Sequence, residues 1–322
     1  MFGSRTFFLG LSLSISISME ENKFKNYVLL HFIVFIWGFT AILGALISIE
    51  AIPLVWYRML LATAFIAFYF LWKRKTFKVD RLGLFKFFLT GIIIALHWVF
   101  FFMAIKESNV SVALVMMSTG AFFTSLIEPV FFKRKINALE IFLGLLVIGG
   151  LYIIFNFESQ YVLGIIYALI ASFLGAVFSV LNGVFIKKYT ANTISFYQLL
   201  FGVVFITMYL LFTGSFSLDF FQISIQDWMY LAILSSICTA YAFIASVQVM
   251  KYLSPYTVML TINLEPIYAI ILALFIFGEE EQMSNTFYLG AFMVLLVVLL
   301  NGIIKNKGPL KDNFLQRLSR KK

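Results

Sequence analysis

Three side chains that can carry a charge stand inside apolar runs of the sequence. Arg58, His97 and Glu265 are each flanked on both sides by mostly apolar residues. In a bilayer such a charge costs at least about 2.5–3.5 kcal/mol, so each residue is a candidate for function. A guanidinium can bind an anionic group, and a histidine or a buried carboxyl can carry a proton. The alternatives are structural: snorkelling for Arg58, a backbone hydrogen bond for His97, and a protonated carboxyl bonded to a neighbouring helix for Glu265.

Two Glu-Pro pairs stand inside the predicted spans, and one of them predicts a disturbed helix. Glu265 follows Asn263 and precedes Pro266, about ten residues or ~15 Å into its run. Proline lacks the backbone donor and clashes with an earlier carbonyl, so we expect a kink or break there. Glu128 precedes Pro129 about four residues from the end of its run, where a structural role is favoured. The two pairs do not align in the repeat described below.

Neutral polar and aromatic side chains complete the candidates for a binding cavity. With 15 Tyr and 40 Phe in the chain, most aromatic residues are expected to face lipid or packing instead. The acidic run 279–281 is expected to be a solvated turn. The remaining candidates are Asn182, Gln198, Trp37, Tyr57, Trp98, Tyr197 and Tyr241.

Known catalytic patterns are absent from the sequence. It contains no GxxxxGK[ST] phosphate loop and no HExxH, DxxD or GxSxG pattern. The single Cys excludes an internal disulfide, and two His without a ligand cluster argue against a zinc site. We therefore expect no metal, no cofactor and no enzymatic activity.

Composition places the chain in a membrane. Of its 322 residues 62% are hydrophobic and only 12% charged, whereas a soluble domain is about half apolar and a quarter charged. Long continuous apolar runs favour helices over barrel strands, and a span needs about 20 such residues. We expect an all-α integral membrane protein with ten spans, at 27–48, 52–72, 82–105, 109–132, 139–157, 161–186, 193–213, 228–250, 255–277 and 286–304.

The basic residues give these ten spans an orientation. If the chain enters the first span from the cytoplasm, nearly all Lys and Arg lie in cytoplasmic loops, as in most membrane proteins. The exceptions are Arg58 and Lys106. Both termini are then cytoplasmic, and the net charge of +9 needs no nucleic acid to explain it.

The ends of the chain lie outside the repeat. Residues 1–26 form an N-terminal arm, in which Met19 could be the natural start and 1–18 an upstream extension. A signal peptide is the alternative, but no small-residue cleavage site follows its apolar stretch. Residues 305–322 form a basic tail.

An internal repeat divides the rest into 27–157 and 161–304. WYRMLLA at 56–62 pairs loosely with FYQLLFG at 196–202, and AIK at 104–106 with VMK at 249–251. Each half has five spans, so the second must enter the membrane in the opposite sense. The loop FFKRK after the fourth span is basic, and its counterpart FGEEE is acidic. Inverted repeats of this kind are typical of secondary transporters.

The order and spacing of these segments resemble the drug/metabolite transporter superfamily, in its EamA-type branch with two EamA-like domains. The likeness covers about residues 27–304, including LEPIYAIILALFIFGEE at 264–280. In the first half Lys133, Arg134 and Lys135 replace the acidic turn, which weakens transfer of any substrate. The resemblance implies an inner-membrane transporter that moves a small metabolite, often outward.

We therefore expect a secondary transporter, in the export direction, that works by alternating access. Proton coupling through His97 or Glu265 and exchange are both open. The alternatives are an intramembrane enzyme and a membrane scaffold subunit. The expected partners are a small metabolite and the lipid bilayer. One chain holds both halves, so a monomer would suffice, and a homodimer remains open.

Overall fold

The computed structural model describes residues 3–74, 78–133, 159–297, residue 300 and a few positions between 142 and 153; for residues 3–22 it describes the backbone alone. Every regular element in these ranges is helical. The first half contains α1 (Gly3–Leu46), α2 (Ala51–Trp72), α3 (Arg81–Glu107), α4 (Val110–Met117) and α5 (Gly120–Phe132). The second contains η1 (Ser159–Tyr161), α7 (Val162–Phe185), α8 (Ala191–Phe212), α9 (Leu218–Phe221), α10 (Ile225–Ser235), η2 (Ser236–Tyr241), α11 (Ala242–Val249), α12 (Pro255–Ile262), α13 (Glu265–Phe277) and η3 (Gly278–Glu281).

Within the described residues, eight helical stretches are long and apolar enough to cross a bilayer. They confirm eight of the ten expected spans, within a few residues at each boundary. The fifth expected span, 139–157, lies largely outside the described residues. The tenth, 286–304, is described as an apolar helix at Asn285–Val297. The tail at 305–322 also lies outside them, whereas the arm continues into the first span as part of α1.

Three of these spans are interrupted near their middle. The expected break at Glu265 is confirmed: α12 ends at Ile262 and α13 begins at Glu265. The fourth span has a matching break between α4 and α5, at Ser118 and Thr119, which the sequence gave no reason to expect. In both spans an 8-residue helix precedes a 13-residue helix. The eighth span contains the π-helix η2.

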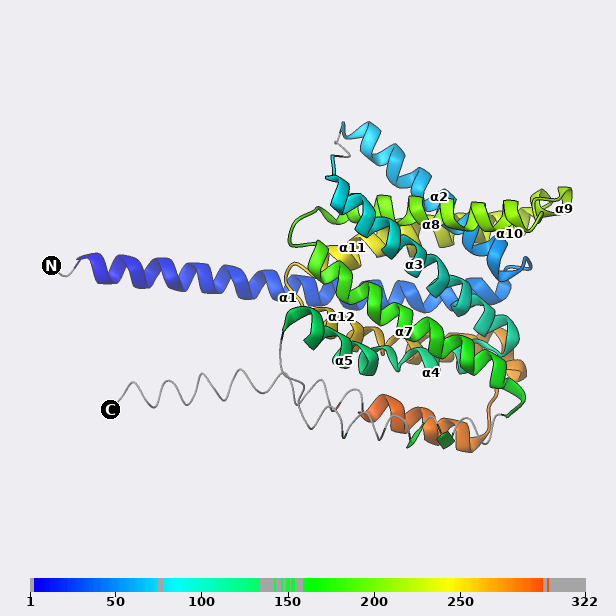
Figure 1. The fold of residues 1–322 in the computed structure, drawn as a ribbon. Helices are drawn as coiled ribbons and strands as arrows, with labels where there is room; N and C mark the ends of the chain where they lie inside the picture. The colour runs from blue at the N-terminus through cyan, green and yellow to red at the C-terminus, as the bar shows by residue number, and fades with distance from the viewer. Residues whose placement is uncertain are drawn as a thin grey trace.

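The two halves pack into each other rather than side by side. Helix α3 of the first half lies along α7 and α8 of the second, while α10 and α11 of the second lie against α1 and α2 of the first (Figure 1). Helices α1 and α7, the first spans of the two halves, run in opposite directions. The opposite directions of these corresponding helices are what an inverted repeat requires.

Glycine permits a close crossing between the two halves. A Cβ added to Gly91 on α3 would lie 2.6 Å from the carbonyl oxygen of Gln198 on α8. One added to Gly202 on α8 would lie 3.2 Å from the carbonyl oxygen of Gly91. The backbones of the two halves therefore touch here, as small residues allow in membrane helices.

One end of the bundle is held by buried carboxylates; we name it the Glu281 end. The Glu281 side chain is only 4% exposed and accepts hydrogen bonds from Val110 N (2.8 Å), Ser111 N (2.9 Å) and Ser111 Oγ (2.8 Å). The expectation of a solvated turn at 279–281 is thus wrong for Glu281, which caps α4. Nearby, the Asp227 carboxylate accepts from Ser48 N at 2.8 Å and Ser48 Oγ at 2.7 Å.

The opposite end, which we name the Asp80 end, is held by exposed groups. Asp80 precedes α3 and accepts hydrogen bonds from Tyr189 Oη at 2.5 Å and Lys188 Nζ at 3.1 Å, both just after α7. The Tyr189 hydrogen bond, followed by that of Lys188, lowers the pKa of the Asp80 carboxyl. Both ends therefore contain contacts between the two halves; among the described residues, the Glu281 contacts are buried and the Asp80 contacts are exposed.

Candidate functional site

A cavity lies between the two halves at the level of the helix breaks. Its empty space amounts to about 790 Å³, a figure that includes its opening to solvent. Residues from α1, α2 and α3 face residues from α7, η2, α11, α12 and α13 across it. Six of the twelve sequence candidates line it: Trp37, Arg58, His97, Trp98, Asn182 and Glu265.

Arg58 on α2 is the charged centre of this cavity. It is 2% exposed, and its Nε donates to Thr239 Oγ1 at 2.6 Å. Its guanidinium carbon lies 4.0 Å from the ring centroid of Trp98, within the range of a cation–π interaction. Nη1 is buried and has no hydrogen-bond partner among the described residues. Arg58 thus does not snorkel; it lies among protein groups.

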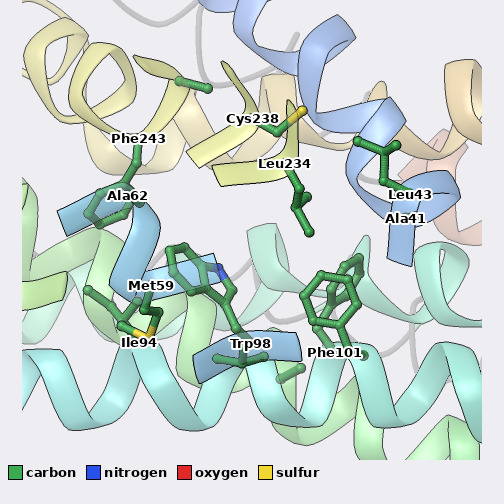
Figure 2. Packing of buried hydrophobic residues seen from close by; sticks show 14 of the residues in the cluster. Ala41, Leu43, Met59, Ala62, Ile94, Trp98, Phe101, Leu234, Cys238 and Phe243 are labelled. Carbon is green, nitrogen blue, oxygen red and sulfur yellow. The ribbon is translucent and has the colours of Figure 1, made fainter. Parts of the chain in front are cut away.

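Aromatic side chains form much of the cavity wall. Trp98 and Phe101 point away from α3 toward the neighbouring helices (Figure 2). Trp37 on α1 donates from Nε1 to the carbonyl oxygen of Cys238 at 3.1 Å, which ties α1 to η2. Phe178 and Phe243 add further ring surface from the second half. The wall is therefore largely apolar, with a few polar groups placed in it.

His97 makes a hydrogen bond to a backbone carbonyl, which was its structural alternative in the sequence analysis, and it also lines the cavity. Its Nδ1 lies 2.6 Å from the carbonyl oxygen of Ala171 on α7. A carbonyl only accepts, so this geometry assigns the proton to Nδ1 and leaves Nε2 as an acceptor in the neutral ring. Gly175 gives the ring its room, since a Cβ there would lie 3.1 Å from His97 Cε1.

Asn182 on α7 is oriented by a second buried amide. Gln198 Nε2 on α8 donates to Asn182 Oδ1 at 2.7 Å. With its oxygen engaged, Asn182 offers its amide nitrogen, and this atom has no partner among the described residues. The Ser179 hydroxyl, one turn away on the same cavity-lining helix, is also buried and unpaired within the described structure.

Glu265 lies at the break of the ninth span. It is the first residue of α13, so its carboxyl is placed at the helix N-terminus, where a negative charge is favoured. It lines the cavity together with Ile262 and Met259 from α12. The break therefore brings a carboxyl to the space that also contains Arg58.

The other six candidates lie outside the cavity lining. Asn263, Glu128 and Gln198 are buried, Tyr57 packs against Phe220 and Tyr197 against Phe87, and Tyr241 is 47% exposed.

Thr239 and Cys238 were not among the sequence candidates. A single Thr or Cys is common in an apolar run and does not indicate a site, and no sequence pattern predicted the π-helix η2 that positions them. Sequence reasoning also missed Thr40 and Ser246, which line the cavity.

Comparison with known proteins gives consistent matches over nearly the whole chain. The model of the EamA-like transporter family matches residues 25–156 and 162–303. An uncharacterized transporter of Archaeoglobus fulgidus is 25% identical over 268 residues, which cover 80% of this chain and 91% of that protein. The uncharacterized transporter YxxF of Bacillus subtilis is 24% identical over 269 residues, covering 81% and 84%. A crystal structure with 13% identity has a TM-score of 0.64 and covers 86% of this chain and 98% of its own, which shows a shared fold.

Proposed function

Since this chain belongs to the EamA-like transporter family and is a multi-pass membrane protein, we propose that it is a secondary transporter. It moves a small metabolite through the cavity by alternating access. The observation that carries the proposal is the composition of the cavity wall, to which both halves contribute. Arg58 comes from the first half, and Asn182 and Glu265 come from the second.

A wall shared between two inverted halves suits a rocking mechanism. If one half reorients against the other, the same polar groups become accessible first from one end and then from the other. The Gly91–Gly202 crossing gives the halves a close backbone contact about which such a movement could turn. We place the Asp80 end in the cytoplasm, because Lys78, Arg81, Lys187 and Lys188 lie there. As the direction of transport we propose export.

Coupling to protons would use groups that face the cavity. Glu265 and His97 are the titratable candidates, and His97 has Nε2 left to accept a proton. Exchange of one metabolite for another needs neither group to titrate. A pH gradient across proteoliposomes separates these mechanisms: if flux ignores the gradient in both directions, proton coupling is excluded and exchange or uniport is left.

The proposal is tested with a metabolite panel and four variants. Purified protein is screened for ligand-dependent thermal stabilisation, and flux of the stabilising compounds is measured in proteoliposomes. We expect Arg58→Ala and Glu265→Gln each to lower flux at least about tenfold, because each removes a charged contact of about 1.5–3 kcal/mol. The matched controls, Arg81→Ala and Glu279→Gln, change exposed residues outside the cavity and should keep wild-type flux.

If folded Arg58→Ala and Glu265→Gln proteins transport as well as the controls, the assigned site is wrong. Chemical conversion of a stabilising compound, instead of its movement, would favour the intramembrane enzyme. Stabilisation only by another membrane protein would favour the scaffold. A single copy per liposome that supports flux would show that the monomer suffices.

A further inference from the structure

The eighth span contains one turn of π-helix beside the cavity. Residues 236–241 form η2, between α10 and α11. Such insertions are rare within helices and occur often at functional sites, because the wider turn moves backbone groups and side chains out of the regular pattern. Here the carbonyl of Cys238 accepts from Trp37, and the hydroxyl of Thr239 accepts from Arg58. The π-turn thus contacts two residues of the cavity wall.

Thr239 fixes the direction in which Arg58 can bind. Its hydroxyl donates its only hydrogen to the carbonyl oxygen of Leu234 at 2.7 Å. The oxygen is then left as an acceptor, and it takes the hydrogen of Arg58 Nε at 2.6 Å. Trp98 covers one face of the guanidinium. With Nε engaged and one face covered, the two Nη groups are the part left to meet a ligand.

Three of the unpaired polar groups in the cavity wall can donate hydrogen bonds. Arg58 Nη1, Asn182 Nδ2 and the Ser179 hydroxyl are buried, and none has a partner among the described residues. A buried donor without an acceptor costs about 1–3 kcal/mol, more when it is charged, so a bound group that accepts several hydrogen bonds would be strongly favoured. A carboxylate offers two oxygens and about four acceptor sites, and a planar guanidinium binds it through two parallel hydrogen bonds.

The rest of the wall sets the other properties of the ligand. Trp37, Phe101, Phe178 and Phe243 surround the polar groups with apolar surface. Glu265 lines the same cavity and would repel a second negative charge. A ligand with one carboxylate and an apolar body satisfies both conditions.

We propose that the Arg58 end of the cavity is a carboxylate site, that Thr239 is its positioning residue, and that the substrates are small monocarboxylates with an apolar body. The proposal rests on the proposed function, because it identifies the substrate class of the same cavity. Thr239 does not touch the substrate; it holds the guanidinium so that the Nη groups face the cavity.

The substrate class is tested by binding to the wild-type protein in nanodiscs. The probes are phenylacetate, indole-3-acetate and 4-methylpentanoate, with phenylacetamide as the neutral control and phenylmalonate as the doubly charged one. We expect at least one of the monocarboxylates to bind, and phenylacetamide and phenylmalonate to bind at least about tenfold more weakly than phenylacetate. If none of the three monocarboxylates binds, or if phenylacetamide binds as well as phenylacetate, the carboxylate site is disproved.

The role of Thr239 is tested by two valine substitutions, Thr239→Val and the control Thr124→Val. Thr239→Val removes the acceptor of Arg58 Nε, and we expect about tenfold weaker binding of the monocarboxylate with an unchanged maximal transport rate. Thr239→Ser keeps the hydroxyl and should bind like wild type. Thr124→Val is the control, since Thr124 is equally buried and bonds to a backbone carbonyl, Gly120 O, but lies outside the cavity lining.

A double mutant separates positioning from a structural role. In Arg58→Lys the charge is kept but the Nε–H is lost, so adding Thr239→Val should change binding by less than about twofold. An equal loss in both backgrounds would show that Thr239 does not act through Arg58. Flux that depends on Arg58 and Glu265 while no monocarboxylate binds would overturn this inference alone. Flux that ignores both residues would overturn the assigned site, on which both proposals rest, and the absence of flux of any stabilising compound would overturn the proposed function.

Discussion

The two broken spans, α4–α5 and α12–α13, have the same helix lengths but different contacts at their beginnings. In each, an 8-residue helix is followed by a two-residue break and a 13-residue helix, so that Val110 corresponds to Pro255 and Gly120 to Glu265. Both second helices end at a residue with positive φ, Lys133 in one half and Gly278 in the other. The break is thus a property of the repeat, and the carboxyl at the break belongs to the second half alone.

The beginnings of the two spans differ more. Glu281 accepts hydrogen bonds from the amides of Val110 and Ser111. At the corresponding place in the second half stands Pro255, which has no amide hydrogen, and the position that corresponds to Glu281 is Ile136. The acceptor and one of the two amide donors are therefore missing from the repeat of this contact. Each helix has its own N-cap, since Ser254 accepts from Thr257 N in α12 and Asn109 accepts from Val112 N in α4, so the Glu281 contacts are an addition found in the first half.

The two halves can therefore have matching backbone breaks while the contacts between them differ in stability at the two ends of the bundle. A buried carboxylate with three hydrogen bonds holds the Glu281 end, while exposed pairs hold the Asp80 end. Exposed ion pairs contribute little, about 0–1 kcal/mol. The Asp80 end should therefore separate at a lower free-energy cost than the Glu281 end.

The largest effect is expected at Glu281. Glu281→Ala leaves two amides without their acceptor, so we expect the free energy of unfolding to fall by about 2–4 kcal/mol. Denaturant unfolding in detergent measures it. Glu279→Ala, in the same turn but exposed, should stay within about 0.5 kcal/mol of wild type. Equal stability of the two variants would contradict the role assigned to Glu281.

The packing of Pro255 should give the next largest effect. A Cβ on Gly183 would lie 2.2 Å from Pro255 Cγ, so Gly183→Ala should cost about 1–3 kcal/mol of unfolding free energy. Pro255→Ala removes the obstructing ring atom. The same glycine substitution made in the Pro255→Ala background should therefore cost less, and a full undiminished cost there would show that the strain arises elsewhere.

The cap of α12 should contribute less than the Glu281 contacts. Ser254→Ala removes the side-chain acceptor for Thr257 N and should cost about 1 kcal/mol. Ser254→Thr keeps a capping hydroxyl and should remain close to wild type. If Ser254→Ala lowers the free energy of unfolding as much as Glu281→Ala does, the contacts at the two ends are equally stabilising and the comparison is wrong.

The smallest effect is expected at Asp80, and it should depend on pH. The Tyr189 and Lys188 hydrogen bonds lower the pKa of this carboxyl, so their stabilisation is present above the unfolded-state pKa of about 3.9. It is lost as the pH falls through the lower folded-state value. The stability difference between wild type and Asp80→Asn should thus be small near pH 6 and vanish in acid. A difference that grows in acid would have the wrong sign.

The spans could be predicted from the sequence because hydropathy alone determines them. The break at Glu265 was predictable because Pro266 cannot continue a regular helix. The break at Ser118 and Thr119 was not, since no proline or charge marks it. Glu281 was misjudged for a related reason: its partners are amides more than 160 positions earlier in the chain, and an acidic turn looks solvated when its tertiary contacts are unknown.

The candidate site was predictable where a charge or a large polar group stands in an apolar run. Arg58, His97 and Glu265 were found in this way, and all three line the cavity. Tyr197 and Tyr241 also stand in apolar runs, but their side chains lie outside the cavity. The sequence could not show this, because tertiary packing determines how each helix is rotated about its axis. Thr239 gave no signal, because its importance comes from the π-turn that brings it to Arg58.

The place of Cys238 has a practical consequence. It is the one cysteine of the chain, it is buried, and it lines the cavity at the π-turn. A thiol-specific reagent added from either side of a sealed vesicle can therefore label this protein only by entering the cavity. The native sequence already provides a single-site reporter, with which the opening of the cavity to each side can be timed without engineering a cysteine-free background.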